Sequence, residues 1–329
     1  MGLPVSGIEI ALDGRDSNSA LNFVSHAHSD HTSGVNKSKP TIGSELTLDL
    51  IEVRKGITIK RQLEMSNIEL LPSGHIFGSR QLYANSDNGY SVLYSGDFQT
   101  QAPILAEKLV TKSADVLIID STYPDPNIVF EDKNEVIEAM RSYVSSKLQK
   151  GIVLFGAYSL GKAQDIIKIL NDFDIVPVVD KKISIINSIY KKHGISLNYS
   201  SIQKDENEFE EFTKHNFVGI VENSRLGDLA VSLSKAYSKR VFTAVATGFA
   251  KVFKIGSDVQ FPLSDHADFC QSKEYIDMCN PKIIYTFGNG SNPSIMARNL
   301  KECGYNAHRF ISYSESLSSE IMWRNKLHY

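Results

Sequence analysis

The first third of the chain is dominated by short, continuous apolar runs that end in polar residues or glycine. These runs lie at Ile8–Leu12, Leu21–Val24, Ser91–Tyr94 and Val116–Ile119. Apolar runs of this length without alternation are typical of strands buried on both faces. The pattern therefore predicts a set of strands with polar clusters at their ends.

Beyond residue 120 the pattern predicts strands that alternate with helices. One helix face is marked by apolar residues at every fourth position, Val136, Met140, Val144 and Leu148, and the helix is expected to end at Gly151. Further strands are predicted at Ile152–Phe155, Ile175–Val179, Val241–Val245 and Lys282–Thr286. Further helices are predicted at Leu160–Leu170, Ile183–Lys192, Asp268–Met278 and Ser294–Cys303. This alternation indicates an α/β fold with a parallel sheet and crossover helices.

Composition and length are those of an ordinary globular protein. The chain has 329 residues, of which 42% are hydrophobic and 22% charged, and this excludes a collagen-like or largely disordered protein. The length indicates two domains, or one domain with a large insertion. We expect a cytoplasmic protein without a membrane partner, because there is no export signal and no run of roughly 18 apolar residues. Cys270, Cys279 and Cys303 lack partners at zinc-site spacing, so reduced thiols are expected.

The distribution of charged residues bears on nucleic-acid binding only in local stretches of the chain. The net charge is −3, so no global basic field attracts nucleic acid. Residues 229–257 nevertheless hold five basic side chains and no acid, and four more lysines lie within residues 181–200. A nucleic-acid partner would have to bind at such local patches.

The most informative segment directly follows the apolar run Leu21–Val24. It contains four potential metal ligands, His26, His28, Asp30 and His31. Clustering these groups costs desolvation and charge repulsion, and a metal ion removes the cost by binding neutral imidazoles and ionised carboxylates. The spacing favours two adjacent metal ions over one.

His75 and Asp97 are the candidates that would complete such a site. Each lies at a predicted strand end beside a glycine, Gly74 or Gly96, and glycine permits close backbone approach. Taken alone, either residue is more typical of a core or turn position. Together with the histidine cluster they predict further ligands.

The order and spacing of these segments resemble the motifs of the metallo-β-lactamase fold, which also include Asp13. Beyond Asp97 the chain resembles the β-CASP nuclease branch of that superfamily. Residues 120–123 (Asp-Ser-Thr-Tyr) resemble its motif A, and residues 263–269 resemble its motif B, which carries His266. Residues 158–164 and 247–249 are similar to stretches of the cleavage-and-polyadenylation-type mRNA 3′-end processing members and of the ligase-associated exonucleases.

The resemblance implies an αββα metallo-β-lactamase domain with an inserted α/β β-CASP cap. Residues 1–123 would form the first part of the metallo-β-lactamase domain, residues 124–254 the cap, and residues 255–329 the completion of the first domain. The resemblance also implies a zinc ion held by His26, His28 and His75. Asp30 and His31 would hold a second zinc, and Asp97 would bridge the two ions. Asp13 would contact the ligand side chains without binding a metal itself.

One position departs from the family pattern. The RNA-processing members have a histidine ligand for the second metal where this chain has Phe287. Phenylalanine cannot coordinate a metal, so one zinc site is expected and the second is weakened. The DNA-repair members related to Artemis also lack this histidine, so the departure weakens an RNA assignment as well.

The expected function is zinc-dependent hydrolysis of phosphodiester bonds in single-stranded nucleic acid, with RNA favoured over DNA. The predicted catalytic residues are Asp30, Asp120 and His266, with His266 as a general acid oriented by Asp120. A DNA exonuclease of the ligase-associated or Artemis-like type and a catalytically weakened RNA-binding processing subunit are the alternatives. Family members often dimerise through the C-terminal region, so a homodimer is left open.

Two stretches are predicted to bind substrate phosphate. Between a strand and a helix start, backbone N–H groups and the helix dipole can hold an anion. The predicted phosphate-binding residues are Ser159, Gly161, Lys162, Thr247 and Gly248. Candidate contacts to the nucleic-acid backbone are Lys239, Arg240, Lys251 and Lys254.

Overall fold

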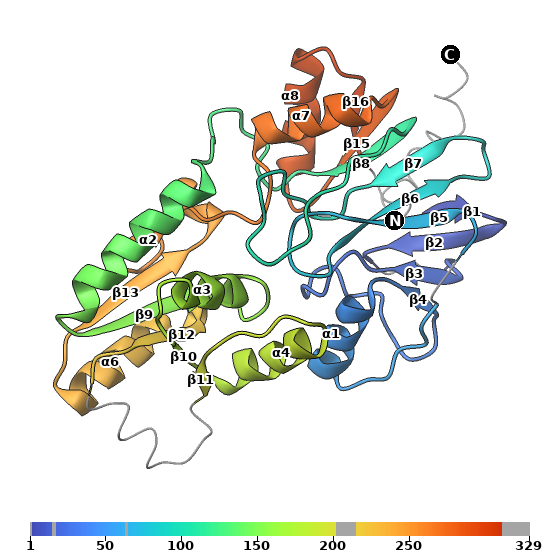
Figure 1. Cartoon of the computed structure of the whole chain (residues 1–329). Helices are drawn as coiled ribbons and strands as arrows, with labels where there is room; N and C mark the ends of the chain where they lie inside the picture. Colours follow the sequence, from blue (N-terminus) through green and yellow to red (C-terminus); the bar gives the residue numbers. More distant parts are fainter. Residues whose placement is uncertain (1, 15–17, 63–64, 202–214, 311–329) are drawn as a thin grey trace.

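The strands of the computed structural model form three sheets, one of four strands and two of six (Figure 1). The structure describes residues 2–14, 18–62, 65–201 and 215–310. Within them, no helix is both long and apolar enough to cross a lipid bilayer.

Two of the sheets pack face to face. The first contains β1 (Gly2–Val5), β2 (Ile8–Leu12), β3 (Leu21–Phe23) and β4 (Thr41–Ile42) in that order. The second has the order β16 (Ala307–Arg309), β15 (Ile283–Phe287), β8 (Val116–Asp120), β7 (Ser91–Tyr94), β6 (Arg80–Asn85) and β5 (Ile68–Pro72). Leu3, Ile10 and Phe23 of the first sheet share one buried cluster with Leu82 and Ile118 of the second.

Helices cover the outer sides of this pair of sheets. The outer face of the second sheet packs against α7 (Phe269–Cys279) and α8 (Asn292–Glu302), and α1 (Glu45–Lys55) packs beside the chain that follows β3. The α/β class predicted from the sequence is confirmed.

The third sheet is parallel throughout. Its order is β11 (Ser200–Ser201), β10 (Val178–Val179), β12 (Val218–Glu222), β9 (Ile152–Ala157), β13 (Val241–Ala246) and β14 (Val259–Phe261). One face packs against α2 (Lys133–Leu148) and α3 (Lys162–Asn171), and the other against α6 (Leu226–Tyr237). Two short 3-10 turns, η1 (Asn223–Arg225) and η2 (Gly248–Lys251), follow β12 and β13. The division of the chain at residues 123 and 254 stays a prediction; β14 of this sheet ends at Phe261.

Helix α4 (Lys181–Lys192) follows β10 of the third sheet and packs against α1, beside which it lies in Figure 1 and with which it shares a buried cluster. The two helices are also linked through Asp49. Its carboxylate lies 2.6 Å from Arg61 Nη2, 2.6 Å from Lys192 Nζ and 2.8 Å from His193 Nε2. Burial would raise the pKa of Asp49, but these hydrogen bonds outweigh it and hold the pKa well below its usual range.

Asp49→Asn is expected to destabilise the protein by about 1–3 kcal/mol at neutral pH, because Arg61, Lys192 and His193 lose the carboxylate that they share. Equilibrium unfolding in urea measures the difference. A carboxyl group with a depressed folded-state pKa stabilises above its unfolded pKa, so the difference should shrink as the pH falls below about 4. Glu138→Gln removes an exposed partner of Arg141 at 4.0 Å and should change stability by less than about 0.5 kcal/mol. Equal effects of the two substitutions would contradict a structural role for Asp49.

Candidate metal centre and active site

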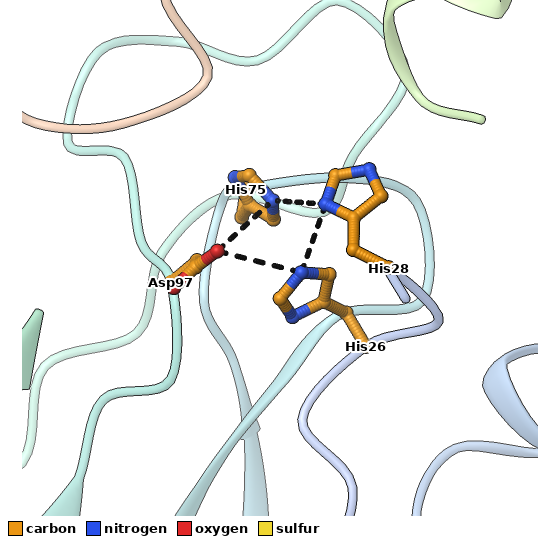
Figure 2. A group of neighbouring side chains, drawn as sticks. All are labelled: His26, His28, His75 and Asp97. Atoms are coloured by element: carbon orange, nitrogen blue, oxygen red, sulfur yellow. Dashed lines mark hydrogen bonds and ion pairs between the residues drawn. The ribbon is translucent and has the colours of Figure 1, made fainter. Parts of the chain in front are cut away.

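Four side chains from three strand ends converge on one point (Figure 2). His26 and His28 follow β3, His75 follows β5 and Asp97 follows β7. One potential ligand atom from each lies within 4.8 Å of all the others. Asp97 Oδ2 is 3.4 Å from His26 Nε2 and 3.7 Å from His75 Nε2. The structure thus brings together ligands that are up to 71 positions apart in the sequence.

The glycines beside these ligands allow the close approach. Gly74 has a φ of +76°, and a Cβ atom there would lie 2.2 Å from the Gln99 carbonyl oxygen. Gly96 has a φ of +54°, and its Cβ would lie 2.6 Å from Cβ of Ser25, the residue before His26. Side chains at either position would push the ligand loops apart.

Backbone carbonyls fix where the protons of two rings lie. His28 Nε2 is 3.2 Å from the Leu160 oxygen, and His75 Nδ1 is 2.8 Å from the Asp265 oxygen. A carbonyl oxygen only accepts hydrogen bonds, so each of these nitrogens carries the ring proton. The other nitrogen of each ring, which faces the centre of the cluster, therefore presents a lone pair.

Ser25 fixes His26 in the same way. Its hydroxyl donates to the Asp13 carboxylate and lies 2.9 Å from His26 Nδ1. Because the single hydroxyl hydrogen is used on Asp13, Nδ1 of His26 must donate to the Ser25 oxygen. Nε2 of His26 then also presents a lone pair toward the centre.

Three lone pairs and a carboxylate facing one another require a cation. His28 Nδ1 is 2.9 Å from His26 Nε2 and 3.2 Å from His75 Nε2, distances at which lone pairs repel. Burial lowers the pKa of all three histidines, and that of His75 falls to about 3, so the rings are neutral. Neutral imidazole is the form that binds metal. The donor set fits a divalent transition-metal ion.

A second group shares Asp97. His31 Nε2 lies 3.2 Å from Asp97 Oδ2 and 3.6 Å from Asp30 Oδ2. Its Nδ1 is 2.8 Å from Asp13, which also accepts a hydrogen bond from the Tyr94 hydroxyl at 2.9 Å. Burial would lower the pKa of His31, but Asp97 and Asp13 raise it well above the usual value. A second cation would take the place of that proton.

Phe287 closes off the position from which a further ligand would come. It ends β15 opposite Asp120 of β8, and its ring packs 4.8 Å from the Tyr94 ring. His266 Nε2 lies 3.9 Å from Asp97 Oδ2, and a ligand atom of Asp120 lies within 4.8 Å of both side chains. Whether the group of Asp30, His31 and Asp97 holds a second metal ion stays a prediction.

His266 and Asp120 form the predicted pair. His266 Nδ1 lies 2.9 Å from Asp120 Oδ2, and Thr122 holds the other carboxylate oxygen through its backbone N–H and its hydroxyl. Burial would lower the pKa of His266, but Asp97 and the hydrogen bond to Asp120 raise it to about 9. The ring can therefore hold a proton on Nε2, beside the metal ligands, at neutral pH.

Except for the fully buried His26 and the Ser25 beside it, these groups line one cleft of about 1090 Å³, which is also lined by residues of the third sheet and its loops. Ser159, Lys162, Thr247 and Gly248, four of the five residues predicted to bind phosphate, line it, and their phosphate-binding role stays a prediction. The Gly161 N–H, however, donates to Gln164 at 2.8 Å.

Lys162 points inward. Its side chain is 4% exposed, pairs with the Asp265 carboxylate and donates to the Leu263 oxygen at 2.9 Å. Because the Asp265 backbone oxygen holds His75, Lys162 has a positioning role that the sequence reading missed. The sequence contained a signal for the role of Asp265, because this residue directly precedes the predicted general acid His266.

Chelation of metal is expected to lower the thermal unfolding midpoint. A ligand at 100 times its Kd stabilises the folded state by about 2.7 kcal/mol, and here it also relieves the repulsion between lone pairs. Scanning calorimetry before and after EDTA treatment measures the shift. His28→Gln should make the midpoint insensitive to EDTA; an unchanged EDTA effect in that variant would place the ion elsewhere.

No family model matches the chain. It is 28% identical over 301 residues to a probable DNA ligase of Opitutus terrae. This match covers 87% of this chain and 28% of the ligase. It is also 27% identical over 244 residues to a probable RNase of Methanocaldococcus jannaschii. This match covers 61% of this chain and 55% of the RNase. Other relatives carry the names RNase J-like protein and DNA cross-link repair 1A protein. The chain thus spans only part of the length of these proteins.

A solved structure supports the fold. The crystal structure of an Enterococcus faecalis protein of unknown function matches with a TM-score of 0.59 at 14% identity, covering 92% of this chain and 81% of that one. Motif order, strand-end geometry and relatives agree, and the chain belongs to the β-CASP nuclease family of the metallo-β-lactamase superfamily.

Proposed function

We propose that the protein is a metal-dependent phosphodiesterase that hydrolyses nucleic acid. The observation that carries the proposal is the convergence of three inward lone pairs and the shared Asp97 carboxylate beside the His266–Asp120 pair, in one cleft. A metal site alone would fit many hydrolases. The added acid pair and the size of the cleft favour a long substrate with a leaving oxygen that must be protonated.

The chain's own residues would act as follows. His26, His28, His75 and Asp97 would hold the first ion, and we propose zinc because the donor set is nitrogen-rich. The ion would polarise the phosphate and make an attacking water more acidic. His266 would donate its Nε2 proton to the leaving oxygen, and Asp120 would keep the Nδ1–H in place. Asp30 and His31 would complete a weaker second metal site with Asp97.

The choice between DNA and RNA is part of the proposal. The motif resemblance favours RNA, and the similarity to the probable RNase supports it. The similarity to the probable DNA ligase covers more of this chain, and Phe287 also departs from the RNA-processing pattern. We therefore propose a DNA strand as the first candidate substrate and RNA as the second. A cytoplasmic location and a homodimer stay predictions.

The basic side chains that line the cleft are Arg54, Lys162, Lys182 and Arg309. The predicted backbone contacts Lys239, Arg240, Lys251 and Lys254 are not among its lining residues; Lys251 pairs with Glu131. Lys182 pairs with Glu222, which lines the same cleft, so phosphates of a bound strand would meet Arg54 and Arg309 first and would compete with Glu222 for Lys182. Affinity should fall as salt rises.

End-labelled single strands of DNA and RNA of one sequence, with 5′-phosphate or 5′-hydroxyl, test the proposal with the zinc-loaded protein. The first labelled product separates cleavage inside the strand from trimming at an end. Asp97→Asn, purified in parallel, should be inactive and so excludes a contaminating nuclease. Binding without cleavage of any strand would support the weakened binding subunit instead, and the absence of both would reject the proposal.

A further inference from the structure

Tyr158 is exposed in a stretch of chain that is otherwise buried. Every other residue from 151 to 164 is buried, whereas Tyr158 is 56% exposed. It follows the last residue of β9 and lines the cleft described above. A single exposed apolar side chain is common on a protein surface, so what matters for Tyr158 is that its exposed ring lines the same cleft as the metal ligands and the His266–Asp120 pair.

The backbone around Tyr158 is fixed. Its carbonyl oxygen accepts from the Ala163 N–H at 3.1 Å, and the next carbonyl, that of Ser159, accepts from the Gln164 side chain at 3.1 Å. These bonds tie the turn to the first turn of α3. The ring is therefore presented from a rigid base, which lowers the entropy lost when it binds something.

The same turn touches the metal centre. Two residues after Tyr158, the Leu160 carbonyl accepts from His28 Nε2 at 3.2 Å. On another side, Tyr158 is close enough to Tyr123 to help raise its pKa, after the larger effect of burial. Tyr123 in turn lies 6.1 Å, ring to ring, from His266. Tyr158 is thus linked to the metal ligands through the turn that holds His28, and to the His266–Asp120 pair through Tyr123.

No partner within the described residues explains the exposed ring. Its hydroxyl makes no hydrogen bond to any of them, and the same cleft is lined by Arg54 and by Lys182, which pairs with Glu222 at 2.5 Å. An exposed aromatic ring beside cations is the combination that binds single strands, since every nucleobase offers a π-face.

We propose that the Tyr158 ring stacks on one nucleobase of the substrate strand, next to the phosphate that reaches the metal centre. The inference rests on the proposed nuclease function and adds a base-binding subsite to it. Stacking holds the strand at a base while the metal centre acts on its backbone. It would thus set which phosphate is cut without reading sequence.

A set of end-labelled strands, each with one abasic position, tests the subsite with the metal-loaded protein. Stacking contributes about 1–3 kcal/mol per base, which corresponds to roughly 5- to 150-fold in kcat/KM. In the wild type, one abasic position should lower kcat/KM by this factor. Tyr158→Ala should show the same loss on the intact strand and no further loss at that abasic position. Tyr158→Phe and Tyr158→Trp should keep the wild-type pattern.

Controls separate the possible failures. Val231→Ala changes an exposed residue of α6 that does not line the cleft, and it should behave as wild type; metal content should be the same in all variants. Equal abasic losses in wild type and Tyr158→Ala, or a Phe variant as impaired as the Ala variant, would overturn the stacking proposal. If the wild type binds strands without cleaving them, the same cycle is read from Kd by fluorescence anisotropy. If the wild type neither binds nor cleaves strands, the proposed function is wrong, and the base-binding subsite that rests on it is wrong as well.

Discussion

Asp97→Asn is expected to abolish metal binding and hydrolysis together. One oxygen of Asp97 lies 3.4 Å from His26, 3.7 Å from His75 and 3.2 Å from His31, so both groups of ligands depend on its charge. Burial would raise the pKa of Asp97, but the surrounding histidines, His31 above all, hold it well below its usual range. Asparagine keeps the shape and removes the charge. Metal per chain should approach zero, and activity should fall by more than the roughly 10²–10³-fold that one lost electrostatic contact costs.

Metal analysis after gel filtration and single-turnover cleavage measure the two losses. Asp228→Asn, at an exposed position of α6, is the matched control and should leave both unchanged. Circular dichroism shows whether the Asp97 variant is folded, and His28→Gln provides a second ligand variant. Full metal content in Asp97→Asn would mean that this carboxylate is not a ligand.

The candidate site could be predicted from the sequence because its ligands are chemically costly and closely spaced. Four ligands within six positions after an apolar strand have few structural explanations, and the structure brings His75 and Asp97 to the same point. The geometry that fixes the proton positions could not be predicted. It depends on the backbone oxygens of Leu160 and Asp265, which are 132 and 190 positions from the rings they hold.

Helix α1 was not predicted from the sequence, because its ends rather than its local pattern decide the structure. Helix α1 has the sequence ELTLDLIEVRK, in which apolar and polar residues alternate over much of its length, as in a strand. The ends override this pattern. Ser44 caps the first turn by accepting from the Thr47 N–H, and Gly56 ends the helix with a φ of 63°. Strand β10, in contrast, is shorter than predicted, because only Val178–Val179 pairs with its neighbours.

His266→Gln is expected to lower kcat by on the order of 10²–10⁴-fold while metal content stays constant. The reason is that its Nε2 proton is the one placed beside the metal ligands, with Nδ1 held by Asp120 at 2.9 Å. Pre-steady-state cleavage with a natural leaving group measures the loss. A substrate with a better leaving group, such as a nitrophenyl phosphodiester, needs less proton donation and should lose less. A fall in bound metal in this variant would instead make His266 a ligand.

Asp120→Asn is expected to move the alkaline limb of the kcat profile to lower pH. Asp120 and Asp97 raise the pKa of His266 to about 9 against the effect of burial, because their negative charges favour the imidazolium. Removing one charge favours the neutral ring, so the pKa of His266 falls. A general acid works only when protonated, so activity should be lost at a lower pH than in the wild type. A bound cation lowers the pKa in both proteins and leaves the direction of this difference unchanged. Profiles that differ in height but not in position would mean that Asp120 only orients the ring.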